Sequence, residues 1–345
     1  MIFRFLTLPT KFFAAFRLAL IFIILLPNAL YASQGGEEEL KGPETAELIN
    51  VGDWQIGLAF GIGKRTSVVY QQDDIPLYLV PSIKYYDEHV FFDNGTLGYT
   101  WHENHKFAFS VITELNPLAA QFYDYHPENV LFDNALSGEA AAPVTDAEDF
   151  NGDASDEITG EPTQGQDGQD SEGPKQQPVE KSIKDIKLKQ PRWSLDAGLQ
   201  LNWFINQNQS LVAQVFTDVA NLHNGQRFEL LWSYGLRFDQ FEKVKDSELG
   251  HWRAQVQLGL SYLNKTTSQY YYGIDQRHLA SGEITYNAKA ALNPSFSITA
   301  TRPLSRHLKL LLFYKQQSLD STISQSPKIT DDKLNTYFAG VVYEF

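Results

Sequence analysis

Histidine, aspartate and serine are the residue types here that could perform acid–base or nucleophilic chemistry or bind a metal ion. The segment His102-Glu-Asn-His105 places two histidines three positions apart, whereas the zinc-protease motif needs them four apart on a helix. A polar hairpin turn is the better interpretation of this segment. The other histidines and aspartates have no spacing that singles out a catalytic pair, so we expect a protein that is not an enzyme.

A second candidate for metal chemistry is Asp149-Phe-Asn-Gly-Asp153, which is similar to the start of a calcium-binding loop. Its sixth position is Ala154 and its twelfth is Gly160, where an EF-hand has Gly and Glu. The sequence therefore predicts no ordered calcium site and no cofactor. The absence of cysteine also removes disulfides, thiolate catalysis and Cys-ligated metals.

Most of the negative charge of the chain is concentrated in one stretch. The formal net charge is −14, and residues 133–180 hold thirteen acidic residues against the single Lys175. This stretch has almost no large apolar residues, so we expect a long disordered acidic loop. No basic stripe is present that would bind nucleic acid, and that class of partner is excluded.

The N-terminus has the pattern of a cleaved secretory signal peptide, residues 1–32. Arg4, Lys11 and Arg17 precede and flank the apolar run Leu18–Leu26, and Ala32 offers a small-residue cleavage site. The apolar run is shorter than the roughly 20 residues that cross a bilayer as a helix. Membrane insertion of residues 33–345 would therefore require a closed β-barrel.

Alternation of apolar and polar residues over about ten positions indicates the strands of such a barrel. From Arg192 to Phe204, apolar residues fall on one face and polar residues on the other, with tryptophans at both ends of the apolar row. Aromatic side chains at strand ends suit the two membrane interfaces. On this basis we assign the following residues to the interfaces: Trp193, Trp203, Trp252, Tyr262, Tyr343 and Phe345.

The fold class predicted is therefore all-β, a transmembrane antiparallel up-and-down β-barrel of about twelve strands. Eleven strands are assigned from the pattern, near residues 53–62, 76–86, 90–101, 106–116, 192–204, 209–219, 227–239, 251–263, 289–302, 307–318 and 335–345. Bacterial barrels have even strand numbers, so a twelfth is expected at Leu118–Leu131 or Tyr270–Ile274; ten would result if two segments merged. The first choice places the acidic loop outside the cell, and the second places it in the periplasm.

Polar residues on the other face of these strands would point into the lumen. We expect Asp196, Gln200, Arg237, Arg253 and Gln255 to form a lumen network in which opposite charges satisfy each other. The alternative is that they line a selective channel.

Several motifs across residues 33–345 resemble the MipA/OmpV family. They are Ile75-Pro-Leu-Tyr-Leu-Val-Pro81, Val90-Phe-Phe-Asp-Asn-Gly-Thr-Leu-Gly-Tyr99, Asp218-Val-Ala-Asn-Leu-His-Asn-Gly-Gln226, Tyr270-Tyr-Tyr-Gly-Ile-Asp275 and Ser326-Pro-Lys-Ile329. The alternation that ends at Phe345 also resembles the signal that the barrel assembly machinery recognises in its clients.

The resemblance implies an outer-membrane protein of a Gram-negative bacterium, surrounded by lipid and lipopolysaccharide. It further implies a scaffold that associates with a lytic murein transglycosylase and a penicillin-binding protein. Other members of the family are osmotically responsive or adhesive, so a small channel and a surface adhesin remain alternatives.

Overall fold

The computed structural model describes residues 52–123, 126–131, 190–274 and 285–345, all within the unit Ile49–Phe345. The predicted signal peptide 1–32, the acidic loop 133–180 and the calcium-like segment Asp149–Asp153 lie outside the described residues. Among the described helices, none has the length and apolar character needed to cross a membrane.

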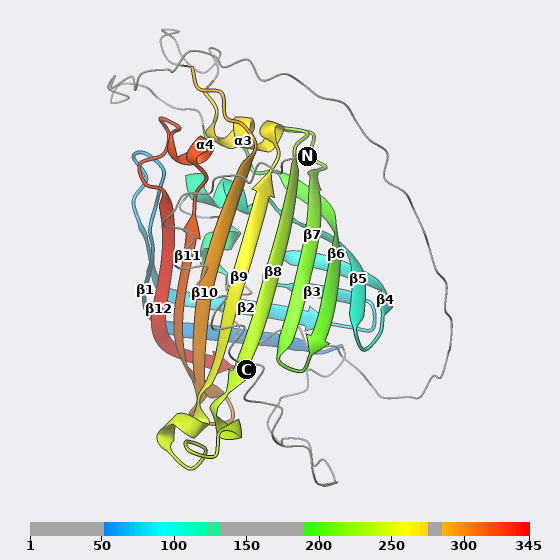
Figure 1. Ribbon diagram of the computed structural model, residues 1–345, viewed down its shortest axis with the longest axis vertical. Coiled ribbons are helices and arrows are strands. Elements are labelled where there is room, and N and C mark those ends of the chain that lie inside the picture. Colours follow the sequence, from blue (N-terminus) through cyan, green and yellow to red (C-terminus); the bar gives the residue numbers. More distant parts are fainter. Residues whose placement is uncertain (1–51, 124–125, 132–189, 275–284) are drawn as a thin grey trace, which may run out of the picture. The chain divides into compact units, whose positions relative to one another are not determined.

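Twelve antiparallel strands in the described part of the chain form a closed barrel, in which each strand pairs with its sequence neighbours and the first pairs with the last (Figure 1). This confirms the predicted fold class. The strands are β1 (Trp54–Arg65), β2 (Ile75–Tyr86), β3 (Val90–Asp93), β4 (Thr96–Glu103), β5 (Phe107–Leu115), β6 (Leu195–Asn206), β7 (Gln209–Asp218), β8 (Gln226–Arg237), β9 (Arg253–Leu263), β10 (Ala291–Pro303), β11 (Leu308–Ser318) and β12 (Lys333–Glu344).

The twelfth strand is not where the sequence analysis placed it. The segment 90–101, predicted as one strand, is the hairpin β3–β4, because Asn94 (φ 47°) and Gly95 (φ 108°) form a tight turn. Positive φ at both central positions is what a two-residue hairpin requires, and Asn-Gly is a strong signal for it. Both earlier candidates for the twelfth strand are wrong, since residues 117–130 and 265–272 contain helices.

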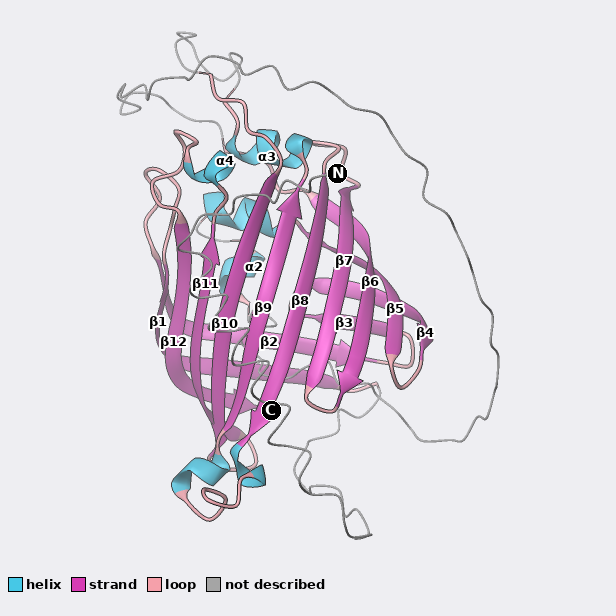
Figure 2. Cartoon of the chain, in the orientation of Figure 1, coloured by secondary structure: helices cyan, strands magenta, loops and turns pink. Residues whose placement is uncertain are grey.

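The helices are short and lie in the connections between strands (Figure 2). They are η2 (Pro117–Phe122), α2 (Pro127–Val130), η4 (Phe238–Gln240), η5 (Glu248–His251), α3 (Lys265–Tyr272) and α4 (Ser321–Ser324). We call the end of the barrel that carries η2, α2, α3 and α4 the helical end. The other end, where β1 begins and β12 finishes, is the terminal end, and it carries η4 and η5. Five strands precede residue 116, so the chain leaves β5 towards its acidic stretch from the helical end.

The two faces of the wall differ in the way that the alternation predicts. Large apolar side chains are exposed on the outer face, among them Ile62 (75%), Tyr78 (65%), Trp54 (58%), Leu199 (53%) and Phe345 (73%). Part of the inner face is apolar too, because the inward residues of β1, β2, β11 and β12 form a core of Ala59, Leu77, Val80, Leu311, Phe313, Phe338 and Val342. The barrel interior is therefore filled with side chains along these four strands.

Glycines permit the close approach of β1 and β12 where the barrel closes. Gly61 and Gly340 are register partners, and a Cβ added to Gly340 would overlap the carbonyl oxygen of Phe60 and approach Gly61 Cα to 2.7 Å. The Phe338 ring also lies against both glycines. By contrast, a Cβ added to Gly57 of β1 would meet nothing nearer than Ser82 Cβ at 3.5 Å.

We therefore expect Gly340→Ala to weaken closure of the barrel and Gly57→Ala to be tolerated. Forcing a methyl group into the packed seam costs about 3 kcal/mol of unfolding free energy, whereas the control stays within about 1 kcal/mol. Urea unfolding in lipid vesicles, followed by tryptophan fluorescence, measures both values. Equal stability of the two variants would contradict the packing at this seam.

Candidate functional site

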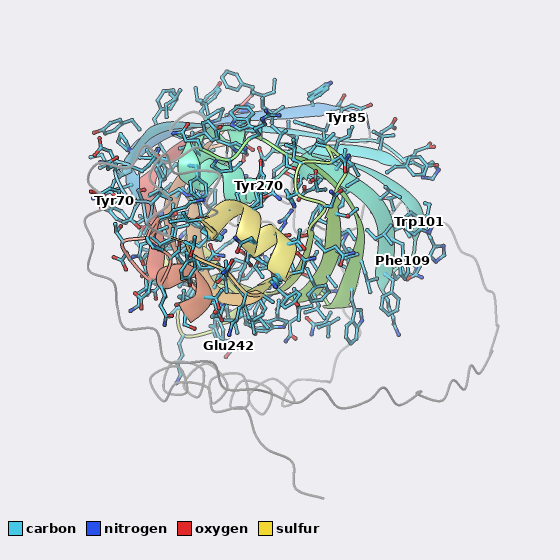
Figure 3. All side chains as sticks on the ribbon, turned by 90° about the horizontal axis from the view of Figure 1, so that it is seen from above. Tyr70, Tyr85, Trp101, Phe109, Glu242 and Tyr270 are labelled. Carbon is cyan, nitrogen blue, oxygen red and sulfur yellow. The ribbon has the colours of Figure 1, made fainter. Side chains whose placement is uncertain are left out.

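One apolar core joins most of the connections at the helical end. It contains Val68 from the β1–β2 connection and residues of η2, α3, α4 and the start of β10 and β12; its members are Val68, Leu118, Ala119, Phe122, Leu263, Tyr271, Tyr272, Ala288, Ala291, Leu319, Ile323, Ile329 and Leu334. Seen from above, α3 and Tyr270 lie inside the ring of strands (Figure 3). These connections thus pack together at this end of the barrel, with α3 inside the ring of strands.

The central helix of this core, α3, is held at both of its ends. The Asn264 side chain accepts a hydrogen bond from Thr267 N at 2.9 Å, which is an N-terminal cap. At the other end, Lys328 Nζ donates to the carbonyl oxygen of Tyr271 at 3.1 Å and Ser326 Oγ donates to that of Tyr272 at 2.6 Å. A side-chain amide that caps the start and a lysine near the last carbonyls are the usual partners of helix termini. They fix α3 as a helix although its sequence is rich in aromatic residues.

Below α3, the inner wall carries a buried charge cluster centred on Arg227 of β8. The Arg227 guanidinium donates to Glu114 Oε1 at 2.5 Å and to Glu229, and Asp196 Oδ2 lies 3.7 Å away. The Phe216 ring packs 4.1 Å from the guanidinium carbon. The Arg227 side chain is only 2% exposed, so each contact acts with little screening by water. The cluster ties β5, β6 and β8 together across the interior.

Asp218, the last residue of β7, organises the neighbouring connection through main-chain hydrogen bonds. Its Oδ2 accepts from the amides of Leu222, His223 and Asn224 at 2.6 to 3.0 Å, and its Oδ1 accepts from Ala220 N and from Ser194 Oγ. A carboxylate that accepts this many N–H groups stabilises a tight turn in place of regular structure. The Asp-to-Gly motif at 218–225 is therefore a folded turn.

His223 lies in this turn with its ring against α3. Its Nδ1 accepts from Gly225 N at 2.9 Å, and its ring centroid lies 5.1 Å from that of Tyr270 and 5.6 Å from that of Tyr271. Its Nε2 lies 4.0 Å from Asp218 Oδ2 and has no hydrogen-bond partner among the described residues. Burial lowers the pKa of His223 below its ordinary value of 6.5, and Arg227 acts in the same direction.

Asp196, Asp218 and His223 are close enough for a metal ion, since one ligand atom from each lies within 4.8 Å of the others. Their bonding opposes this function. Asp218 already accepts five hydrogen bonds, and Arg227 lies 3.7 Å from Asp196. Because Nδ1 of His223 accepts a main-chain N–H, the proton of the neutral ring is on Nε2, which cannot then bind a metal. The three residues therefore form a structural polar cluster.

The five predicted lumen residues all lie on the inward parity of their strands, but the structure does not bring them into one network. Asp196 belongs to the Arg227 cluster near the helical end, whereas Arg237 and Arg253 are register partners at the terminal end. Gln200 accepts from Gln214 Nε2 at 2.7 Å, and Gln255 is 3% exposed with no partner for its amide among the described residues. The opposite charges are satisfied by other residues, because Arg237 pairs with Asp239 and Arg227 lies beside Asp196.

Glu114, Arg227 and His223 are further members of this site that the spacing of residue types did not single out. Arg227 and Glu229 alternate with outward Phe228 and could have been found by their inward parity alone. The histidines of His102-Glu-Asn-His105 lie at the end of β4 and in the β4–β5 turn, where Asn104 Oδ1 accepts from Lys106 N and Phe107 N. The expectation of a polar turn there is confirmed.

The predicted interface aromatics lie on the outer face or at its ends. Trp193, Trp203, Tyr262 and Tyr343 are between 40% and 43% exposed, Phe345 is 73% exposed, and Trp252 is half-buried. Their placement in the membrane interfaces stays a prediction.

Removing the guanidinium should destabilise the barrel strongly. In Arg227→Met, Glu114, Asp196 and Glu229 lose their shared cation, which we expect to lower the unfolding free energy by about 3–5 kcal/mol. Arg237→Met is the matched control, because the Arg237–Asp239 pair is partly exposed, and it should cost less than about 1 kcal/mol. Urea titration in lipid vesicles compares the two; similar losses would mean that the buried cluster is not a source of stability.

Comparison with known proteins places the chain in a family. The family described as "MltA-interacting protein MipA" matches residues 56–345. "Putative outer membrane protein YiaT" of Escherichia coli (strain K12) is 29% identical over 145 residues, which are 41% of this chain and 54% of that protein, and its counterpart in Escherichia coli O157:H7 matches equally. The match thus spans about half the length of these relatives.

Solved barrels are similar only distantly. A FadL homologue of Pseudomonas aeruginosa has a TM-score of 0.31 at 8% identity, covering 85% of this chain and 77% of that one. A bacterial polysaccharide outer membrane secretin has the same TM-score and identity, with 85% and 98% covered. These likenesses are too weak to indicate a function. The family match alone covers most of the barrel, and this chain belongs to the family of the MltA-interacting protein MipA.

Proposed function

We propose that this protein is an outer-membrane β-barrel that acts as a scaffold for murein enzymes in the periplasm, and that its β8–β9 connection (238–252) is the contact site. The family supports the class of partner, because the relative that gives it its description is an interactor of MltA, a lytic murein transglycosylase. The observation that carries the proposal is that this connection at the terminal end is long and held by its own contacts, yet exposes apolar side chains.

The outer face supports insertion into a membrane. Exposed apolar side chains occur on strands all around the barrel, for example Phe60 on β1, Val111 on β5, Val215 on β7 and Ile298 on β10. An apolar outer surface of this extent is unfavourable in water and favourable in lipid. The closed ladder leaves no strand without partners on both sides, as a wall in lipid requires.

Connection lengths support one orientation. At the terminal end, residues 87–89, 104–106, 207–208 and 304–307 make short turns, and only the β8–β9 connection is long. At the helical end the connections between described strands are longer, except for the two-residue Asn94-Gly95 turn. Barrels of this type have short periplasmic turns and longer external loops. The terminal end therefore faces the periplasm, and β5, the last described strand before the acidic stretch, ends on the outer side.

The packing of the helical end favours a scaffold over a channel. Residues from η2, α3 and α4 share one apolar core there, and the core of β1, β2, β11 and β12 fills part of the interior. An open pore requires a continuous polar path through the barrel. Filled interiors suit a protein that presents a surface and does not conduct.

The β8–β9 connection is a long one at the terminal end and is organised by its own contacts. Arg237 pairs with Asp239 at 2.6 Å, and Glu248 pairs with Arg302 of β10. Ser247 Oγ donates to the Val244 carbonyl at 2.7 Å. Despite this order, Phe241 and Leu249 are 45% and 55% exposed. A preformed loop with exposed apolar residues loses little entropy on binding, which favours a protein partner.

Orientation is tested with single cysteines, since the chain has none of its own. Asp73→Cys lies in the exposed β1–β2 connection at the helical end, and Glu242→Cys lies in the β8–β9 connection (Figure 3). A membrane-impermeant maleimide should label Asp73→Cys on intact cells and Glu242→Cys only after the outer membrane is permeabilised. The reverse pattern would place the β8–β9 connection outside the cell and rule out a periplasmic partner there.

Partner binding is tested by substitution of the two exposed apolar residues. After mild crosslinking in cells, the unsubstituted protein should co-purify with a lytic murein transglycosylase and a penicillin-binding protein. The double substitution Phe241→Ser and Leu249→Ser should weaken this capture by roughly tenfold or more, because each apolar contact at an interface centre contributes about 1–3 kcal/mol.

Leu304→Ser is the control, since Leu304 is 50% exposed in the β10–β11 turn of the same end. Capture by this variant should match that of the unsubstituted protein. An equal loss in both variants would move the contact site away from the β8–β9 connection. Failure of the unsubstituted protein to capture either enzyme would overturn the scaffold itself.

A further inference from the structure

We propose that His223 is an acid-sensitive latch that holds α3 across the helical end of the barrel and releases it when the imidazole is protonated. This regulation is independent of the proposed scaffold role. It rests on the hydrogen bond of the ring with Gly225, on the packing of Gly225 against α3, and on the burial of the ring between charged groups.

The His223 ring accepts a hydrogen bond from the main chain of its own turn. Nδ1 of His223 accepts the Gly225 N–H at 2.9 Å, so Nδ1 is unprotonated and the neutral imidazole carries its hydrogen on Nε2. A second proton can be added only at Nδ1. Two donors, Nδ1–H and the Gly225 N–H, would then point at each other, and the hydrogen bond would be lost. Protonation is therefore incompatible with the present conformation of the turn.

The turn that contains His223 is in direct contact with α3. A Cβ on Gly225 would overlap Thr267 Oγ1 and approach Thr267 N to 2.8 Å, so the main chain of Gly225 lies directly against the first turn of the helix. Next to it, the Gln226 carbonyl accepts from Asn264 N and Thr267 Oγ1, both at 3.1 Å. A change in the turn at Gly225 must therefore displace the start of α3, which has no space to accommodate it.

Charged groups of both signs face the His223 ring. Asp218 and Asp196 favour the protonated His223 ring, whereas Arg227 of β8 opposes its protonation. Tyr270 and Tyr271 of α3 pack against the ring. Lys328 donates a hydrogen bond to the Tyr271 carbonyl. Burial outweighs the carboxylates and lowers the pKa of His223 in the latched state. The Tyr271 hydroxyl does not titrate in this range, because burial raises its pKa.

The sign of the pH effect follows from this lowered pKa. A histidine in water takes up its proton near pH ~6.5, and the latched histidine does so only at lower pH. At a pH between the pKa of His223 in the released state and its lower pKa in the latched state, the released state binds the proton and the latched state does not. Acidification through this window therefore favours release, by up to about tenfold per pH unit, and the latch is complete above it.

The experiment uses Ser268→Cys in the full barrel, inserted in lipid vesicles. Ser268 lies in α3, is fully buried, and its hydroxyl has no hydrogen-bond partner among the described residues, so a thiol fits its place. The rate of maleimide labelling reports release of the helix. Dividing it by the rate for the exposed Lys265→Cys on the same helix removes the pH dependence of the thiol itself. We expect this ratio to rise from pH ~7.5 to pH ~5, by up to about tenfold per pH unit within the window between the two pKa values.

Two substitutions of the latch give opposite expectations. In His223→Asn, the side-chain oxygen takes the position of Nδ1 and still accepts from Gly225, but it cannot be protonated. Its labelling ratio should stay low at every pH. His223→Gln has no acceptor at that position, so its ratio should be high already at pH ~7.5 and should not change with acid.

His126 is the control for acid effects elsewhere in the same end. It is buried beside Trp193 with a ring distance of 4.8 Å, and burial, followed by Arg65, lowers its pKa to about 4. His126→Asn should keep the full response between pH ~7.5 and pH ~5. The latch is overturned if His223→Asn responds to acid like the unsubstituted protein, if the response is lost in His126→Asn, or if Ser268→Cys labels equally at all pH values.

Discussion

The closure of the strand ladder is the constraint on which the rest of this structure depends. In lipid, every main-chain N–H and C=O of the wall must bond within the protein, so β1 and β12 have to meet along their full length. Gly61 and Gly340 face each other at this seam and let the two strands approach with the Phe338 ring above them. The same closure fixes the shear of the barrel and therefore which inward residues of neighbouring strands lie opposite one another.

Closure also creates an interior that has to be filled or hydrated. Along β1, β2, β11 and β12 it is filled by apolar side chains, and near β5, β6 and β8 by carboxylates around Arg227. At the helical end the connections fold over the interior and share a second apolar core. Apolar packing and buried ion pairs thus fill different parts of the same interior.

The sequence predicted the wall better than it predicted the interior, and the reason is physical. Alternation is a local property, so Arg192–Phe204 identifies the outward face of β6 correctly from the residues alone. Contacts across the interior depend on register, which sequence spacing does not contain. Asp196 and Arg237 were expected in one network, but β6 and β8 run in the same direction, so Asp196 near the start of β6 lies beside Arg227 and Arg237 lies at the other end. The hairpin at Asn94-Gly95 could have been predicted, because its turn chemistry is written in two adjacent residues.

The segment at Tyr270–Tyr272 illustrates why the helical end was hidden from sequence analysis. Three adjacent aromatic residues favour a strand by propensity, yet they lie in α3 because Asn264 caps the helix and Ser326 and Lys328 bind its last carbonyls. Ser326 and Lys328 come from a connection more than fifty residues away, so no local pattern could reveal them. His223 and Gly225 form a second set of tertiary contacts, at the start of α3. A helix held against its own propensity by a few named contacts is also one that the loss of a single contact can release.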